Sequence, residues 1–194
     1  MGDPAGGSQT PGSVTPGGVP TVTPVTYRKS RGQGATVATW KALSQTLVKD
    51  LMKALKEYGQ DSPYFEGMLF SSFGGITVVP FDLRQIFKCL SSKMEFELWE
   101  VTWGKLLKDA LPGLLEDPTA ATDNAGNPIT LNHLLGEGDW KAATDQATNI
   151  PPNVLEFVAN QACKAFLKMQ PYGPSQCYLE IFQEPQEPYV KFVE

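Results

Sequence analysis

The chain has 194 residues, of which 41% are hydrophobic and 10% aromatic, which suits one sizeable globular domain with tails or two small domains. Its formal net charge of −5 and pI of about 5.0 argue against a general nucleic-acid binder. We also expect no membrane contact, because no run of about 18 apolar residues occurs and the polar, Pro-rich start lacks the features of a signal peptide.

The N-terminal part of the chain divides into two stretches of different composition. Residues 1–23 are rich in Pro and Gly and carry almost no large apolar side chains, so they are predicted to be disordered. Strand-forming residues then occur only over Val25–Val37, on both sides of the Gly-bearing stretch Ser30–Gly34. This pattern predicts an N-terminal β-hairpin.

The chain from residue 39 to residue 169 is dominated by helical periodicity, with apolar residues recurring at spacings of three and four. Ser62 and Pro63 are typical of an N-cap and first helical position, whereas Pro112 with Gly113 is a stop signal. We therefore expect an all-α fold whose helices pack as a compact bundle. The expected helices cover residues 39–58, 63–73, 80–90, 93–111, 131–135, 141–148 and 152–169.

Two stretches are predicted to connect packed elements rather than to form them. Residues 112–128 are rich in Pro, Gly, Asp, Asn and Thr, which predicts a long exposed loop. Such a loop is often functional, although an exposed connection is the simpler interpretation. Residues 171–176, with Pro171, Gly173 and Pro174, have the composition of a linker.

The end of the chain carries the most specific sequence pattern. Residues Ile181–Tyr189 read Ile-Phe-Gln-Glu-Pro-Gln-Glu-Pro-Tyr. This resembles the opening of the major homology region of retroviral capsid proteins, roughly Ile-x-Gln-Gly-Pro-x-Glu-Pro-aromatic, which begins the capsid C-terminal domain. Because the pattern stops in mid-motif, we expect residues 177–194 to be the truncated start of that domain, frayed or only partly helical.

Further segments are similar to those of beta- and alpha-retroviral Gag and of endogenous retrovirus K-type Gag. They are Lys49–Gly59, Asp61–Tyr64, Val79–Asp82 and Leu98–Gly104, together with Pro24–Thr26, which resembles the start of a mature capsid protein. The resemblance implies a capsid N-terminal-domain helical bundle over residues 24–170, with a β-hairpin at its start. Residues 1–23 then correspond to a spacer before the capsid.

The resemblance singles out Pro24 and Asp82 as a structural switch. In the family, proteolytic cleavage frees a proline ammonium that folds back and pairs with an aspartate at the start of the third helix. A new cation beside a buried carboxylate forms a charge-assisted bond only after cleavage. The alternative is that Asp82 simply caps its helix.

The resemblance also draws attention to the basic residues of the first expected helix. At 100° per residue, Lys41, Lys56, Lys49 and Lys53 fall at about 0°, 60°, 80° and 120°, opposite the apolar face. In capsid hexamers such residues are implied to line a pore that binds inositol phosphate as an assembly cofactor. A solvated helix face is the competing interpretation.

Gln183 and Glu187 are the two polar residues of the homology region. The resemblance implies that they belong to a buried hydrogen-bond network of the C-terminal domain. Here Glu184 stands where the family usually has glycine, and the chain ends before the arginine that completes the network.

The leading functional hypothesis is a structural Gag capsid protein that associates with itself into hexamer- or pentamer-type lattices, in a virion or in the cytoplasm. Full-length Gag or host factors bound at loop 112–128 are the candidate partners. A host-retained Gag fragment that restricts or poisons other capsids is a related alternative. A helical interaction adaptor is a further one.

An enzyme fits the sequence poorly. There is no Asp-Thr-Gly or Asp-Ser-Gly protease motif, no phosphate-binding loop, and no nucleophile–base arrangement around the single histidine, His133. Cys89, Cys163 and Cys177 are far apart and form no Cys-x-x-Cys motif, so we expect no metal site and interpret the cysteines as small hydrophobes.

Overall fold

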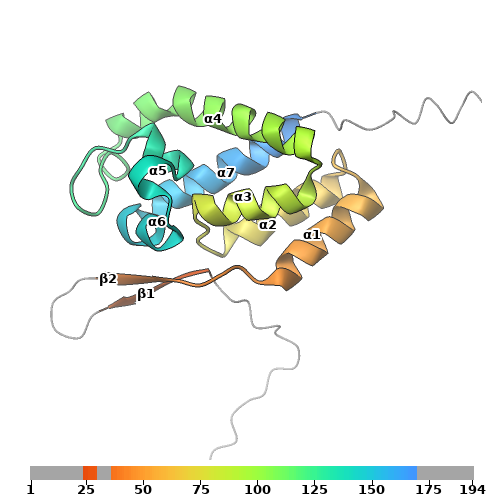
Figure 1. The fold of residues 1–194 in the computed structure, drawn as a ribbon, viewed down its shortest axis with the longest axis horizontal. Helices are drawn as coiled ribbons and strands as arrows, with labels where there is room; N and C mark the ends of the chain where they lie inside the picture. Colours follow the sequence, from red (N-terminus) through yellow and green to blue (C-terminus); the bar gives the residue numbers. More distant parts are fainter. Residues whose placement is uncertain (1–23, 30–35, 170–194) are drawn as a thin grey trace, which may run out of the picture.

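The computed structural model describes residues 24–29 and 36–169 (Figure 1). Within them the chain forms a two-stranded hairpin followed by a bundle of helices, as expected of an all-α domain with an N-terminal hairpin. The spacer 1–23, the linker 171–176 and the segment 177–194 with Gln183 and Glu187 lie outside the described residues. Their assignments stay predictions.

The hairpin consists of β1 (Val25–Lys29) and β2 (Thr36–Trp40), paired antiparallel from Val25 opposite Trp40 to Lys29 opposite Thr36. Alternate residues face the helical body, so Val25 is buried and Tyr27, Ala38 and Trp40 pack against the core. In Figure 1 the hairpin lies along one side of the bundle, with α6 (Ala143–Asn149) next to β2. The predicted hairpin is thus confirmed.

The first three helices are α1 (Gln45–Tyr58), α2 (Pro63–Gly74) and α3 (Pro80–Leu90). The start of α2 is as expected, because the Ser62 hydroxyl accepts a hydrogen bond from the Tyr64 N–H and Pro63 is the first helical residue. The start of α1 was predicted wrongly at residue 39. The strand β2 continues through Trp40, and the side chain of Ser44 caps the helix five residues later than Thr39.

The longest helix, α4 (Lys93–Glu116), begins with a capping box. The Ser92 N–H donates to Glu95 Oε2 at 2.7 Å, and the Glu95 N–H donates to Ser92 Oγ at 3.4 Å. The helix passes through Pro112, so the predicted stop at that residue is wrong. Leu111 and Leu114 pack against the core on both sides of the proline, which favours continuing the helix despite the missing N–H.

The C-terminal half contains α5 (Leu131–Leu135), a short 3-10 helix (Gly138–Trp140), α6 and α7 (Pro152–Lys168). Figure 1 shows α7 running through the bundle, and it contacts α2, α3, α4 and α5. The indole N–H groups of Trp99 and Trp103 in α4 donate to carbonyls of α7, Ala162 at 3.0 Å and Val158 at 3.3 Å. The buried indoles therefore satisfy their polar atoms without leaving the apolar core.

Arg84 connects α3 to the neighbouring elements. Its Nε contacts Glu100 Oε1 of α4 at 2.9 Å, its guanidinium donates to the Leu135 carbonyl at the end of α5, and a further nitrogen lies 3.3 Å from Glu137. The same guanidinium lies over the Trp103 ring at 5.3 Å. These contacts fix α3, whose N-terminus holds the candidate site.

Candidate functional site

The open end of the hairpin, formed by Pro24, Val25 and Trp40 and called the hairpin root below, lies against the helical body. Pro24 is buried, and its carbonyl accepts a hydrogen bond of 2.6 Å from the Lys41 N–H just beyond the last residue of β2. The next residue, Val25, is buried and pairs with Trp40. Pro24, which is predicted to carry the freed ammonium, therefore lies directly before the first residue of β1.

Trp40 joins this root to the start of α3. Its indole N–H donates to Asp82 Oδ2 at 2.9 Å, and its ring meets Phe81 edge-on with centroids 6.0 Å apart. Asp82 is the third residue of α3 and only 2% exposed. Contacts thus connect Asp82 through Trp40 to the hairpin root, and the helix-cap role of Asp82 stays a prediction.

The electrostatic environment of Asp82 is unusual for a buried carboxyl group. Burial raises its pKa to about 6, against the lowering effects of the hydrogen bonds from Trp40 and Val79. Among the described residues, no lysine, arginine or histidine forms an ion pair with Asp82. Buried carboxylates usually have a cationic partner or a full set of hydrogen bonds, so this site favours the arrival of a cation.

A second buried polar residue, Gln146 of α6, fixes the same end of α3. Its side-chain carbonyl accepts from the Phe81 N–H at 2.9 Å, and its amide donates to the Trp140 carbonyl at 2.7 Å. Gly136 has φ +65°, and a Cβ there would lie 2.3 Å from Gln146 Nε2 and 3.0 Å from Pro80 Cβ. Nothing in the local sequence pattern distinguishes Gln146 from a surface glutamine, so sequence reasoning missed it.

A groove of about 450 Å³ opens beside Asp82, between α1 and α3. Two of its apolar residues are well exposed, Met52 at 46% and Phe81 at 39%. Such exposed apolar surface is typical of contact sites. The groove is lined by Trp40, Ala42, Leu43, Gln45, Val48, Lys49, Met52, Phe81, Asp82, Gln85 and Cys89.

The candidate polyanion residues Lys41, Lys49 and Lys53 are all exposed, but they do not form one helical stripe. Lys41 lies in the connection before α1, because the helix begins at Gln45. Lys53 lies 4.0 Å from Glu57 one turn along. Lys49 borders the groove and forms no ion pair with another described residue, which makes it the best placed of the three.

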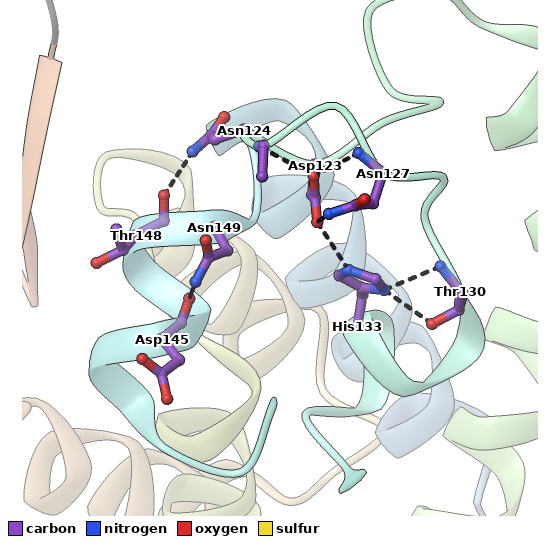
Figure 2. Close-up of polar contacts among 9 residues, drawn as sticks. Asp123, Asn124, Asn127, Thr130, His133, Asp145, Thr148 and Asn149 are labelled. Carbon is purple, nitrogen blue, oxygen red and sulfur yellow. Dashed lines mark hydrogen bonds and ion pairs between the residues drawn. The ribbon is translucent and has the colours of Figure 1, made fainter. Parts of the chain in front are cut away.

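Residues 112–128 were predicted as a long exposed loop, and residues 117–128 do form a largely exposed connection without helix or strand. Residues 112–116 continue α4, and Ala120 and Asp123 are buried. The side chain of Asp123 accepts hydrogen bonds from the backbone N–H groups of Ala125 and Asn127 at 2.9 and 2.8 Å, and from Asn127 Nδ2 at 3.2 Å (Figure 2). The prediction is therefore wrong for residues 112–116, which are helical, and it did not foresee that Asp123 is buried within an otherwise exposed loop.

His133 completes this cluster and ties the loop to α5. The Thr130 N–H donates to His133 Nδ1 at 3.1 Å, so the proton of the neutral ring is placed on Nε2, 3.3 Å from Asp123 Oδ2. Burial alone would raise the pKa of Asp123, but hydrogen bonds from Asn127, His133 and Ala125 hold it below its usual range. Figure 2 also shows Asn124 donating to the Thr148 carbonyl of α6, at 2.6 Å.

The two cysteines of the described residues differ in their exposure to solvent. Cys163 is buried in α7, where desolvation raises its pKa to about 12, whereas Cys89 on α3 is exposed. In this part of the chain no three His, Cys, Asp or Glu residues are grouped so that they could hold a metal ion. No helix there is both long enough and apolar enough to cross a membrane.

Comparison with known proteins identifies the family of this fold. The sequence profile described as gag protein p24 N-terminal domain matches residues 39–173. The chain belongs to this family. It is 30% identical over 169 residues to the human endogenous retrovirus group K member 8 and member 113 Gag polyproteins, and to the group K member 9 Pol protein. The match covers 84% of this chain, 24% of each Gag polyprotein and 14% of the Pol protein.

Family membership gives the site its context. The Gag p24 N-terminal domain is a structural domain rather than a catalyst, and domains of this family generally self-associate. The chain spans about a quarter of the length of the curated Gag relatives it matches.

Protonation of Asp82 should make stability depend on pH. Because the folded-state pKa of about 6 lies above the ordinary value of 3.8, the native chain binds more protons than the unfolded chain between these values. The contribution of Asp82 to the free energy of unfolding should therefore fall as pH rises from about 4 to about 6. Urea unfolding followed by tryptophan fluorescence on the whole chain measures it.

Asp82→Asn should remove this pH-dependent part, so that the difference in unfolding free energy between the variant and the parent changes steadily over that interval. Asp50→Asn, at an exposed position of α1, is the matched control and should follow the parent curve. A constant difference between Asp82→Asn and the parent at every pH would contradict a raised pKa at Asp82.

Removing the carboxylate of the loop cluster should loosen the loop. Asp123→Ala leaves the donors of Ala125, Asn127 and His133 without their acceptor, which should cost about 1–3 kcal/mol. Amide hydrogen exchange should accelerate over residues 117–130. Asp145→Ala, an exposed acid in the neighbouring helix α6, should change stability by about 0.5 kcal/mol or less. Equal effects of the two changes would show that the loop does not depend on Asp123.

Proposed function

We propose that this chain is the capsid assembly domain of a retroviral or endogenous retroviral Gag protein. It would associate with copies of itself into hexamer- or pentamer-type lattices, in a virion or in the cytoplasm. The single observation that carries the proposal is the buried carboxyl of Asp82, which has no cationic partner among the described residues and is bonded to the hairpin root through Trp40. Family membership supports the structural role.

Cleavage between Thr23 and Pro24 would turn this site into a maturation switch. In the uncut chain the Pro24 nitrogen is an amide without a proton. After cleavage it is a secondary ammonium, which carries charge and two N–H donors. A charge-assisted bond to Asp82 would lower the pKa of the carboxyl and hold the hairpin root against α3.

The switch would act on assembly through the groove between α1 and α3. Trp40, which donates to Asp82, is also a lining residue of this groove, as is Phe81. A change in the bonding of Asp82 therefore alters the position or order of two residues that a neighbouring copy would contact. We propose that the neighbour packs on the exposed side chains of Met52 and Phe81.

A polyanion such as an inositol phosphate would serve as an assembly cofactor. In a ring of six copies each lysine is repeated six times, and such a ring focuses positive potential. Lys49 is the leading residue of this proposal, with Lys41 and Lys53 beside it in the sequence. The pairing of Lys53 with Glu57 reduces the charge that Lys53 can offer.

Other partners follow from the same assembly. Full-length Gag would be recruited through the contacts that join two copies of this domain. A host factor would be recognised on the surface of loop 112–128, whose core is held by Asp123. We propose no direct contact with nucleic acid or with a membrane.

Assembly is tested on two chains, residues 1–194 and a version that begins at Pro24, with and without inositol hexakisphosphate. Light scattering and electron microscopy should give rings, tubes or spheres for the Pro24 form, promoted by the polyanion. Asp82→Asn in the Pro24 form should lose this assembly, and Lys49→Ala should lose only the response to the polyanion. Lys141→Ala, an exposed lysine next to α6, is the matched control.

A monomer or simple dimer in every condition would contradict autonomous assembly. Two hypotheses would then remain, a host-retained Gag fragment and a helical interaction adaptor. Co-assembly that blocks the lattice growth of another Gag would favour the first of them. A dimer that does not depend on the cut before Pro24 would favour the adaptor.

A further inference from the structure

The outer face of α4 carries the most exposed large apolar residues of the described chain. Val101 is 71% exposed and Met94 is 67% exposed, and Leu98 between them is 39% exposed. Positions 94, 98 and 101 fall on one side of an α-helix. Scattered exposed hydrophobic residues are ordinary, but three on one helical face form a contiguous apolar strip, which is typical of a contact site.

Exposed charged residues of both signs lie along the same face, with Asp109 beside the two lysines at its C-terminal end. Glu97 lies within the apolar strip, and Lys105 and Lys108 lie one to two turns beyond it. All three are exposed, and none forms an ion pair with another residue of the described part of the chain. The hydroxyl of Thr102 is satisfied within the helix by the Leu98 carbonyl at 2.8 Å.

The charges and apolar side chains of this face can pair between two α4 helices that lie antiparallel. If a second α4 lies antiparallel across the first with a two-fold axis near Val101, the two Val101 side chains meet. The same arrangement places Glu97 of each copy beside Lys105 of the other, four residues from the axis on either side. Lys108 then lies over Met94, where the methylene stem of the lysine covers the apolar side chain. A parallel pair would instead set like charges against each other.

We propose that the outer face of α4 is a two-fold interface with a second copy of this chain. The strip from Met94 to Lys108 is about 21 Å long, at 1.5 Å per residue. One such helix pair buries less than a standard interface, so the association should be weak, in the range of tens to hundreds of micromolar. Exposed ion pairs add little affinity, and they set the antiparallel register.

This interface is distinct from the groove between α1 and α3. Figure 1 shows α4 on the side of the bundle away from the hairpin, so the two contacts can be made at once. A ring is built by a contact between two different surfaces, whereas a two-fold contact joins a surface to itself. Together the two kinds of contact would link rings into a sheet. The α4 contact does not require ring formation or cleavage before Pro24.

Cross-linking tests the geometry in the whole chain. Cys89 and Cys177 are first changed to alanine, leaving only the buried Cys163, and single cysteines are then introduced as Val101→Cys or Leu115→Cys. Both positions are exposed on α4. In the antiparallel pair the two 101 positions meet, whereas the two 115 positions lie about 42 Å apart along the axis. A short bismaleimide should therefore join Val101→Cys at least fivefold faster than Leu115→Cys. Equal rates would overturn the proposal.

Charge exchange tests the register independently. Sedimentation equilibrium of the parent chain should show a monomer–dimer equilibrium, which Glu97→Lys or Lys105→Glu should weaken about three- to tenfold. The double variant Glu97→Lys with Lys105→Glu should recover most of the loss, because the pair is restored with its signs exchanged. A parent that stays monomeric at millimolar concentration, or a double variant no better than the single ones, would overturn the proposal. Met52→Glu in the groove should leave this dimer unchanged.

Discussion

The buried carboxyl of Asp82 is the constraint on which the arrangement of this domain depends. It stands in the first turn of α3 and accepts the indole N–H of Trp40 at 2.9 Å. This bond connects the only strand pair of the described chain to the helical body, and it sets Trp40 and Phe81 along one groove. Asp82 therefore links the hairpin, the helical bundle and the exposed groove between α1 and α3 in one place.

The domain contains two buried aspartates whose surroundings differ in an informative way. Asp123 is surrounded by donors from Ala125, Asn127 and His133, and its pKa is held low. Asp82 is also shielded from solvent, and burial raises its pKa to about 6 because it has fewer donors to oppose that effect. The first arrangement is complete and serves to hold a loop. The second lacks a cation, which is why a newly formed proline ammonium is a physically reasonable partner.

The sequence predicted most of the helices because their signals are local. The cap Ser62 with Pro63, and the apolar spacing of α3, α4 and α7, each lie within a few residues of the element they define. The failures have a different origin. Asp123 is buried through a partner ten residues away, and Pro112 is tolerated because Leu114 beyond it packs on the core. Gln146 acts on a helix 65 residues earlier in the chain, and no local pattern reports such a contact.

The state of the Asp82 carboxyl can be measured directly. The side-chain carboxyl carbon of Asp82 is followed by NMR as a function of pH, in the chain that begins at Met1 and in one that begins at Pro24. We expect a pKa near 6 in the first chain and a clearly lower pKa in the second, because only the second carries a proline ammonium. The same raised pKa in both chains would show that Asp82 does not receive the new N-terminus.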